Sequence, residues 1–84
     1  MTRKEKLLER LQQRPNDFTW DELKSVLRSL GYVQRKTGRT GGSRRRFTHP
    51  TAPTITLHKP HPSRIVKMYV INDILELLRR EDMI

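Results

Sequence analysis

The 84-residue sequence contains no cysteine, so neither a disulfide bond nor a thiolate metal site can stabilise the fold. Long apolar runs are also missing. The longest, residues 68–71, has four residues and is far too short for a membrane span or the core of a signal peptide. Only 33% of the residues are hydrophobic, which predicts one small core and a single domain over residues 1–84. We therefore expect a cytoplasmic protein that does not bind a membrane.

Acidic residues are absent from the middle of the chain, because no Asp or Glu lies between Leu23 and Asn72. The same stretch holds all three histidines and many Lys and Arg residues, and the whole chain has a net charge of +9. A generic solvated surface is the simplest explanation, but solubility does not require such segregation of charge. The pattern indicates a polyanionic partner, and nucleic acid is the one we expect.

Hydrophobic spacing and turn residues predict the element order ααβββα. The predicted elements are helices over residues 2–14 and 19–30, strands over 32–37, 43–49 and 54–58, and a helix over 69–80. Thr19 and Glu22 form a capping box at the start of the second helix, and Gly31 is a stop signal at its end. The sequence thus predicts an α+β fold in which helices cover one face of a three-stranded antiparallel sheet.

The other face of this sheet is the candidate site. Because strand side chains alternate, an inward Phe47 places Arg44 and Arg46 on the open face, where Thr56 and His58 join them. Cations and hydroxyl groups on one face are typical of a surface that binds RNA phosphates and 2′-hydroxyl groups. The residues that we expect to contact RNA are Lys36, Arg39, Ser43, Arg44, Arg45, Arg46 and Lys59.

The histidines favour acid–base chemistry over metal binding. No carboxylate or cysteine lies near His49, His58 or His61 in the sequence, so we expect neither a metal nor another cofactor. A histidine can act as the base that removes the proton of an RNA 2′-hydroxyl while nearby cations stabilise the charged phosphorus centre. His58 is the best-placed candidate and His61 the second. It is equally open that His58 only ends a strand and binds a phosphate or the backbone.

Four segments resemble the HicA toxins of bacterial HicA–HicB toxin–antitoxin systems. These segments are Gly-Gly-Ser-Arg-Arg-Arg-Phe-Thr-His-Pro at 41–50, Leu-Gly-Tyr at 30–32, Leu-His-Lys-Pro-His-Pro at 57–62, and the predicted helix from Tyr69 to Leu78. The resemblance covers residues 19–80 as the core and leaves the helix of residues 1–14 as an addition. It implies a fold similar to the double-stranded-RNA-binding domain and an mRNA interferase, a toxin that cleaves mRNA without a metal. It also implies a HicB-like antitoxin, with DNA contacted only indirectly through the antitoxin complex.

One position departs from the family motif. The HicA motif has a catalytic histidine after a Gly-Ser or Gly-Gly pair, whereas Arg44 follows Gly42 and Ser43 here. Arginine stays protonated and cannot act as a base. Three explanations remain open: another histidine has taken over the role, the chain is a relative that only binds, or the position carries an inactivating substitution. The alternatives to an endoribonuclease are a non-catalytic RNA-binding module and an interaction protein whose basic face docks an acidic antitoxin.

Overall fold

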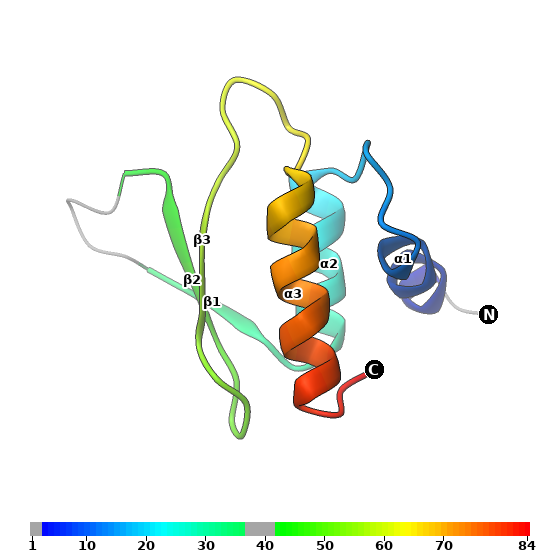
Figure 1. Cartoon of the computed structure of the whole chain (residues 1–84). Helices are drawn as coiled ribbons and strands as arrows, with labels where there is room; N and C mark the ends of the chain where they lie inside the picture. Colours follow the sequence, from blue (N-terminus) through cyan, green and yellow to red (C-terminus); the bar gives the residue numbers. More distant parts are fainter. Residues whose placement is uncertain (1–2, 37–41) are drawn as a thin grey trace.

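The computed structural model describes residues 3–36 and 42–84 and confirms the predicted element order. The helices are α1 (Arg3–Gln12), α2 (Trp20–Ser29) and α3 (Met68–Arg80), and the strands are β1 (Val33–Arg35), β2 (Arg44–Thr48) and β3 (Ile55–His58). The strands form one antiparallel sheet in the order β1-β2-β3. Helices α2 and α3 cover one face of this sheet, and α1 packs against α2 farther from the sheet (Figure 1).

The hydrophobic core fills the space between the sheet and the helices. Phe47 on β2 and Ile55 and Leu57 on β3 point toward the helices, and none of the three is more than 8% exposed. The apolar stripes of α2 and α3 pack against them, with the buried residues Trp20, Leu23, Val26, Leu27, Ile71, Ile74, Leu75 and Leu78. One face of the sheet is therefore used for packing, and the other is left open.

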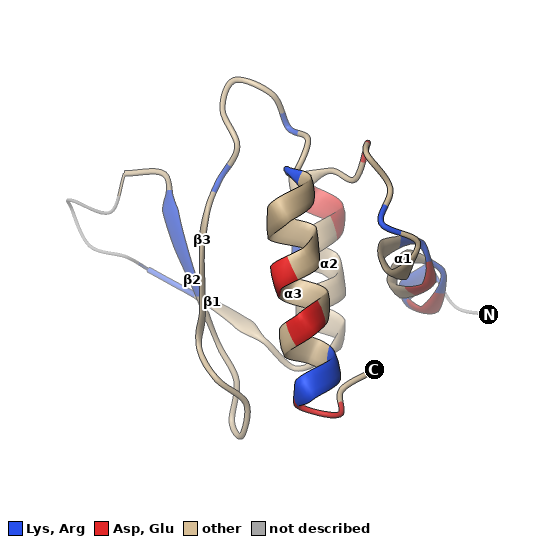
Figure 2. Cartoon of the chain, viewed as in Figure 1, with Lys and Arg blue, Asp and Glu red and all other residues tan. Residues whose placement is uncertain are grey.

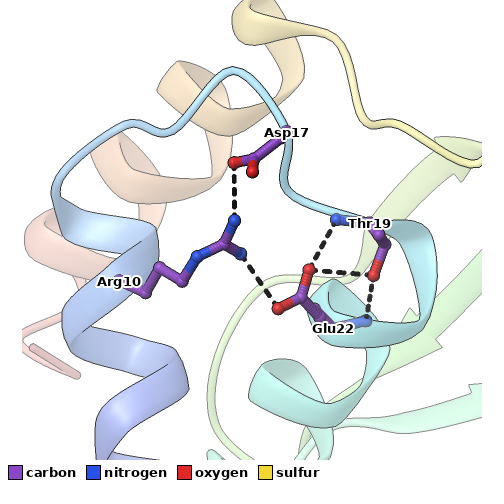
Figure 3. Close-up of polar contacts among 4 residues, drawn as sticks. All are labelled: Arg10, Asp17, Thr19 and Glu22. Atoms are coloured by element: carbon purple, nitrogen blue, oxygen red, sulfur yellow. Dashed lines mark hydrogen bonds and ion pairs between the residues drawn. The ribbon is translucent and has the colours of Figure 1, made fainter.

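A polar network connects α1 to the start of α2 (Figure 3). The Thr19 hydroxyl accepts a hydrogen bond from the Glu22 N–H, and the Glu22 carboxylate accepts one from the Thr19 N–H, so the predicted capping box is confirmed. The Arg10 guanidinium donates to the same carboxylate at 2.9 Å and also to Asp17. Burial alone would raise the pKa of Glu22, but the hydrogen bonds from Thr19 and the charge of Arg10 outweigh it and lower that pKa.

Helix α1 contributes to the core through its leucines. Leu11 is fully buried, and Leu7 and Leu8 are half-buried against the core cluster. Phe18, in the segment that joins α1 to α2, is also fully buried, and the Arg10 guanidinium lies 5.3 Å from the centre of its ring. Helix α1 is therefore packed onto the rest of the fold.

Helix α2 ends in a Schellman motif at Gly31, which confirms the predicted stop. Gly31 has φ +101°, a conformation that strongly favours glycine. Its N–H donates to the Arg28 carbonyl at 3.1 Å, and the Tyr32 N–H donates to the Leu27 carbonyl at 3.0 Å. A Cβ atom at Gly31 would lie only 2.9 Å from Nε2 of His49, so this turn also needs glycine for close packing.

Candidate functional site

The strand register aligns basic residues across the open face of the sheet. Arg46 is paired with Arg35 on one side and with Thr56 on the other, and Arg44 is paired with His58. Directly opposite residues in an antiparallel sheet point to the same face. Since the intervening positions Phe47 and Leu57 are buried, the open-face positions predicted from the alternation are confirmed.

The acidic residues of the described chain are confined to the helices and the segments next to them, whereas basic residues lie on both the sheet and the helices. Figure 2 shows Lys and Arg on β1, β2 and the loop after β3, while the Asp and Glu residues that it draws lie on the helices and next to them. Arg35 and Arg46 lie directly opposite each other, an arrangement that costs stability through Coulomb repulsion. A bound polyanion would remove this repulsion, so the arrangement suits a phosphate-binding surface.

A pocket of about 300 Å³ lies where β3 leaves the sheet and runs toward α3. Its polar lining consists of Ser43, His58, Lys59, His61, Ser63 and Lys67, and its apolar lining of Trp20, Pro60, Ile65, Val66, Tyr69 and Val70. The Ser43 hydroxyl oxygen lies 3.4 Å from Nδ1 of His58. The Lys59 N–H donates to the Ser43 carbonyl at 2.7 Å, so β2 and β3 stay together up to the pocket. We call this the histidine pocket.

Backbone hydrogen bonds hold the loop that forms the far wall of the histidine pocket. The Trp20 N–H donates to the Arg64 carbonyl, and the Val66 N–H donates to the Phe18 carbonyl, both at 2.8 Å. Val66 is only 4% exposed and belongs to the core. The loop between β3 and α3 is therefore hydrogen-bonded to the start of α2. These bonds restrain the positions of His58 and His61.

A shallower basic groove adjoins the histidine pocket. It shares Ser43, Lys59, Pro60 and His61 with the pocket and adds Arg45, Pro62 and Arg64. The alternation places Arg45 on the inner side of β2, yet its guanidinium reaches the rim, where it donates to the carbonyls of Gly42 and Arg44 at 2.8 and 3.0 Å. The groove continues the positive surface from the pocket to the loop.

The structure thus brings most of the predicted site residues together. Ser43, Arg45, His58, Lys59 and His61 line the histidine pocket or its groove. The remaining predicted residues do not line the pocket or its groove. Arg44 and Arg46 are on the open face, and Lys36 is exposed just after β1. Arg39 lies outside the described residues.

Several residues that line the pocket or groove were not predicted from the sequence, among them Arg64, Lys67 and Tyr69. Lys67 and Tyr69 flank the start of α3, and Arg64 lies in the loop before it. The sequence signal that could have found Tyr69 is its place on α3 away from the buried stripe of Ile71 and Ile74. Arg64 and Lys67 belong to the acid-free stretch, but their spatial position depends on the loop anchors.

The third histidine, His49, has a structural role. Its Nδ1 accepts hydrogen bonds from the Thr51 and Ala52 N–H groups, both at 3.1 Å. Its Nε2 lies 3.0 Å from the Leu30 carbonyl, to which it must donate because a carbonyl only accepts. The ring also lies 4.9 Å from the Tyr32 ring, so His49 fastens the turn after β2 to the end of α2.

Residues 3–36 and 42–84 contain neither a metal-ligand cluster nor a membrane-spanning helix. No three side chains of the types that bind metals lie close enough together to hold an ion. No helix in these residues has the length and apolar character needed to span a bilayer.

The fold and site define a small α+β domain with a basic sheet face and a pocket that contains two histidines. A family model described as the HicA toxin of bacterial toxin–antitoxin systems matches residues 20–79 of the chain. Because this match covers most of the sequence, the chain belongs to the HicA toxin family and is the toxin of a toxin–antitoxin system. Helix α1 precedes the matched segment. Comparisons with curated proteins and with solved structures give no match.

Proposed function

We propose that this HicA-family chain is an mRNA endoribonuclease that works without a metal ion. The observation that carries the proposal is the histidine pocket, where His58 and His61 line one space together with Lys59 and Lys67. Two imidazoles can supply a base and an acid at neutral pH, and two ammonium groups can stabilise added negative charge. The basic sheet face next to the pocket supplies phosphate contacts for the RNA strand.

The cleavage step uses the 2′-hydroxyl of the RNA as the nucleophile. His58 takes the proton from this hydroxyl, and the 2′-oxygen forms a bond to the adjacent phosphorus. The bond from phosphorus to the 5′-oxygen breaks as His61 gives a proton to that oxygen. The products are a 2′,3′-cyclic phosphate and a 5′-hydroxyl end. The ammonium groups of Lys59 and Lys67 stabilise the negative charge of the pentacoordinate phosphorane that forms before the bond to the 5′-oxygen breaks.

Ser43 is proposed as a positioning residue for His58. Its hydroxyl oxygen lies 3.4 Å from Nδ1 of the imidazole, so it can restrain the ring and leave Nε2 to act on the substrate. Ser43 is itself held by the hydrogen bond between its carbonyl and the Lys59 N–H. This arrangement resembles the general pattern in which a base is oriented by a third group.

The test is cleavage of a labelled mRNA by the purified protein in the presence of EDTA. His58→Ala and His61→Ala should each lower the cleavage rate by about 10²- to 10⁴-fold, the usual contribution of a general acid or base. Arg79→Ala is the matched control, because it removes one positive charge from the far end of α3 and should leave the rate unchanged. Undiminished cleavage by both histidine variants would overturn the proposed mechanism.

Arg44 favours one alternative, a HicA scaffold that binds RNA without cutting it. By the resemblance, Arg44 stands where the family motif has its catalytic histidine, and it is paired with His58 across the open face. An arginine there can bind phosphate but cannot transfer a proton. This alternative predicts that the native chain binds RNA without cleavage and that Arg44→His begins to cut.

A HicB-like antitoxin is the proposed protein partner. The described residues that line the groove include no Asp or Glu, and the stretch between Leu23 and Asn72, which carries the basic face, contains none either. An acidic surface of the antitoxin would therefore complement both the face and the groove. Such a complex would block RNA access, and DNA would be contacted only through the antitoxin. Competition between the antitoxin and a labelled RNA oligonucleotide tests this, since simultaneous binding of both would contradict a shared surface.

A further inference from the structure

The apolar wall of the histidine pocket exposes side chains that the proton transfers do not use. Tyr69 is 63% exposed and Ile65 is 37% exposed, and both line the pocket. Of the exposed large hydrophobic residues in the described chain, Val33 lies on β1, whereas the others fall within residues 65–69. Exposed apolar surface is thus concentrated beside the two histidines, which points to a ligand that has an apolar part.

The Tyr69 ring is carried on a rigid support. Tyr69 is the second residue of α3, and the Val70 and Ile71 N–H groups donate to the Lys67 carbonyl at 3.0 and 3.2 Å. The other face of α3 is anchored in the core through Ile71 and Ile74. A tyrosine has only two side-chain torsions, so holding its ring against a ligand costs little conformational entropy.

The chemistry of the pocket decides which ligand suits this ring. The polar wall presents Lys59 and Lys67, and the described residues that line the pocket include no Asp or Glu. The polar and apolar walls face one space of about 300 Å³, so a single ligand can contact both. A flat apolar group joined to an anion fits these features, and a nucleobase joined to its phosphate has this form.

We propose that Tyr69 stacks on a nucleobase next to the phosphate that is cut, so that the pocket takes single-stranded RNA with one base unstacked. This inference rests on the proposed function, because it assigns the substrate of the same site. Aromatic stacking accepts any base, since every base has a π face, and base-paired bases in a duplex are not available for it. The pocket should therefore discriminate single-stranded from double-stranded RNA more strongly than it discriminates one base from another.

The test measures binding separately from cleavage. The ligand is a short RNA oligonucleotide with a 2′-deoxy substitution at the reacting nucleotide, which removes the nucleophile and prevents cutting, and a fluorescent base whose emission is quenched by stacking. Tyr69→Ala should weaken its binding by about fivefold to a hundredfold and abolish the quenching. Tyr69→Phe keeps the ring and should retain both. Met68→Ala is the matched control, because Met68 is a 38% exposed neighbour that does not line the pocket.

The outcomes separate this inference from the proposed function. Loss of single-strand affinity in Tyr69→Ala with unchanged affinity for the same strand in a duplex supports stacking, even if the native protein never cuts RNA. Unchanged single-strand affinity and quenching in Tyr69→Ala overturn the inference, even if the native protein cuts RNA. If Tyr69→Ala instead weakens only antitoxin binding, the apolar wall is a protein-docking surface and the inference is also overturned. Urea unfolding followed by Trp20 fluorescence verifies that each variant is folded.

Discussion

Replacing Glu22 with glutamine removes a charge from the junction between α1 and α2 while keeping the shape of the side chain. The carboxylate accepts hydrogen bonds from the Thr19 N–H and hydroxyl, both at 3.0 Å, and from the Arg10 guanidinium at 2.9 Å. A capping interaction contributes about 0.5–2 kcal/mol, and a partly exposed ion pair about 0.2–1 kcal/mol. Because the glutamine oxygen keeps part of the cap, we expect Glu22→Gln to lower the free energy of unfolding by about 1 kcal/mol.

The size of this difference should depend on pH. The pKa of Glu22 in the folded protein lies below its ordinary value of 4.5, so its stabilisation is fully present above that pH. The stabilisation is lost as the pH falls through the folded-state pKa, because the protonated side chain resembles glutamine. Urea titrations followed by the fluorescence of Trp20 measure the effect, since Trp20 is the sole tryptophan and is only 4% exposed. The native and variant curves should differ at neutral pH and converge in strong acid.

Glu9→Gln is the matched control for this experiment. Glu9 is exposed on α1, so its replacement should change the free energy of unfolding by less than about 0.5 kcal/mol. An identical urea midpoint for Glu22→Gln and the native protein at neutral pH would refute the reasoning. A difference that grows as the pH falls would refute it as well, because the sign of the pKa shift requires the opposite trend.

Two further predictions concern the core and the open face. Leu11→Ala should lower the free energy of unfolding by about 2–5 kcal/mol, because it leaves a cavity at a fully buried site. If urea unfolding shows a loss below about 1 kcal/mol, the packing of α1 into the core is contradicted. Arg46→Ala should weaken binding of all RNA sequences alike and reduce the slope of log affinity against log salt by about 0.7–0.9, measured by fluorescence anisotropy. An unchanged slope would mean that RNA does not cross the open face at Arg46.

The order of the elements could be predicted because short-range chemistry fixes where they begin and end. The capping box at Thr19 and the glycine at Gly31 act within a few residues, and both are confirmed. The strand ends were less accurate, since β1 was predicted from residue 32 and begins at Val33. The Tyr32 N–H is used in the helix-terminating hydrogen bond to Leu27, so Tyr32 cannot join the sheet through that group.

The site could be predicted only in part, because it depends on contacts between distant segments. Alternation along the strands was enough to place Arg44 and His58 on the open face. The wall that carries Tyr69 exists because the loop before α3 is hydrogen-bonded to Phe18 and Trp20, which are far away in the sequence. No local sequence pattern predicts this contact between the loop and the start of α2, and a single sequence gives no other signal for it.

The central claim, that the histidine pocket cuts RNA through its 2′-hydroxyl, is tested most directly with two oligonucleotides that differ by one oxygen atom. Both have the same sequence, and one lacks the 2′-hydroxyl at the nucleotide where the native protein cuts mRNA. We expect the protein to bind both in EDTA, to cut only the all-ribose strand to a 2′,3′-cyclic phosphate, and to lose this activity in His58→Ala. Cleavage of both strands, or binding of both with cleavage of neither, would contradict the central claim.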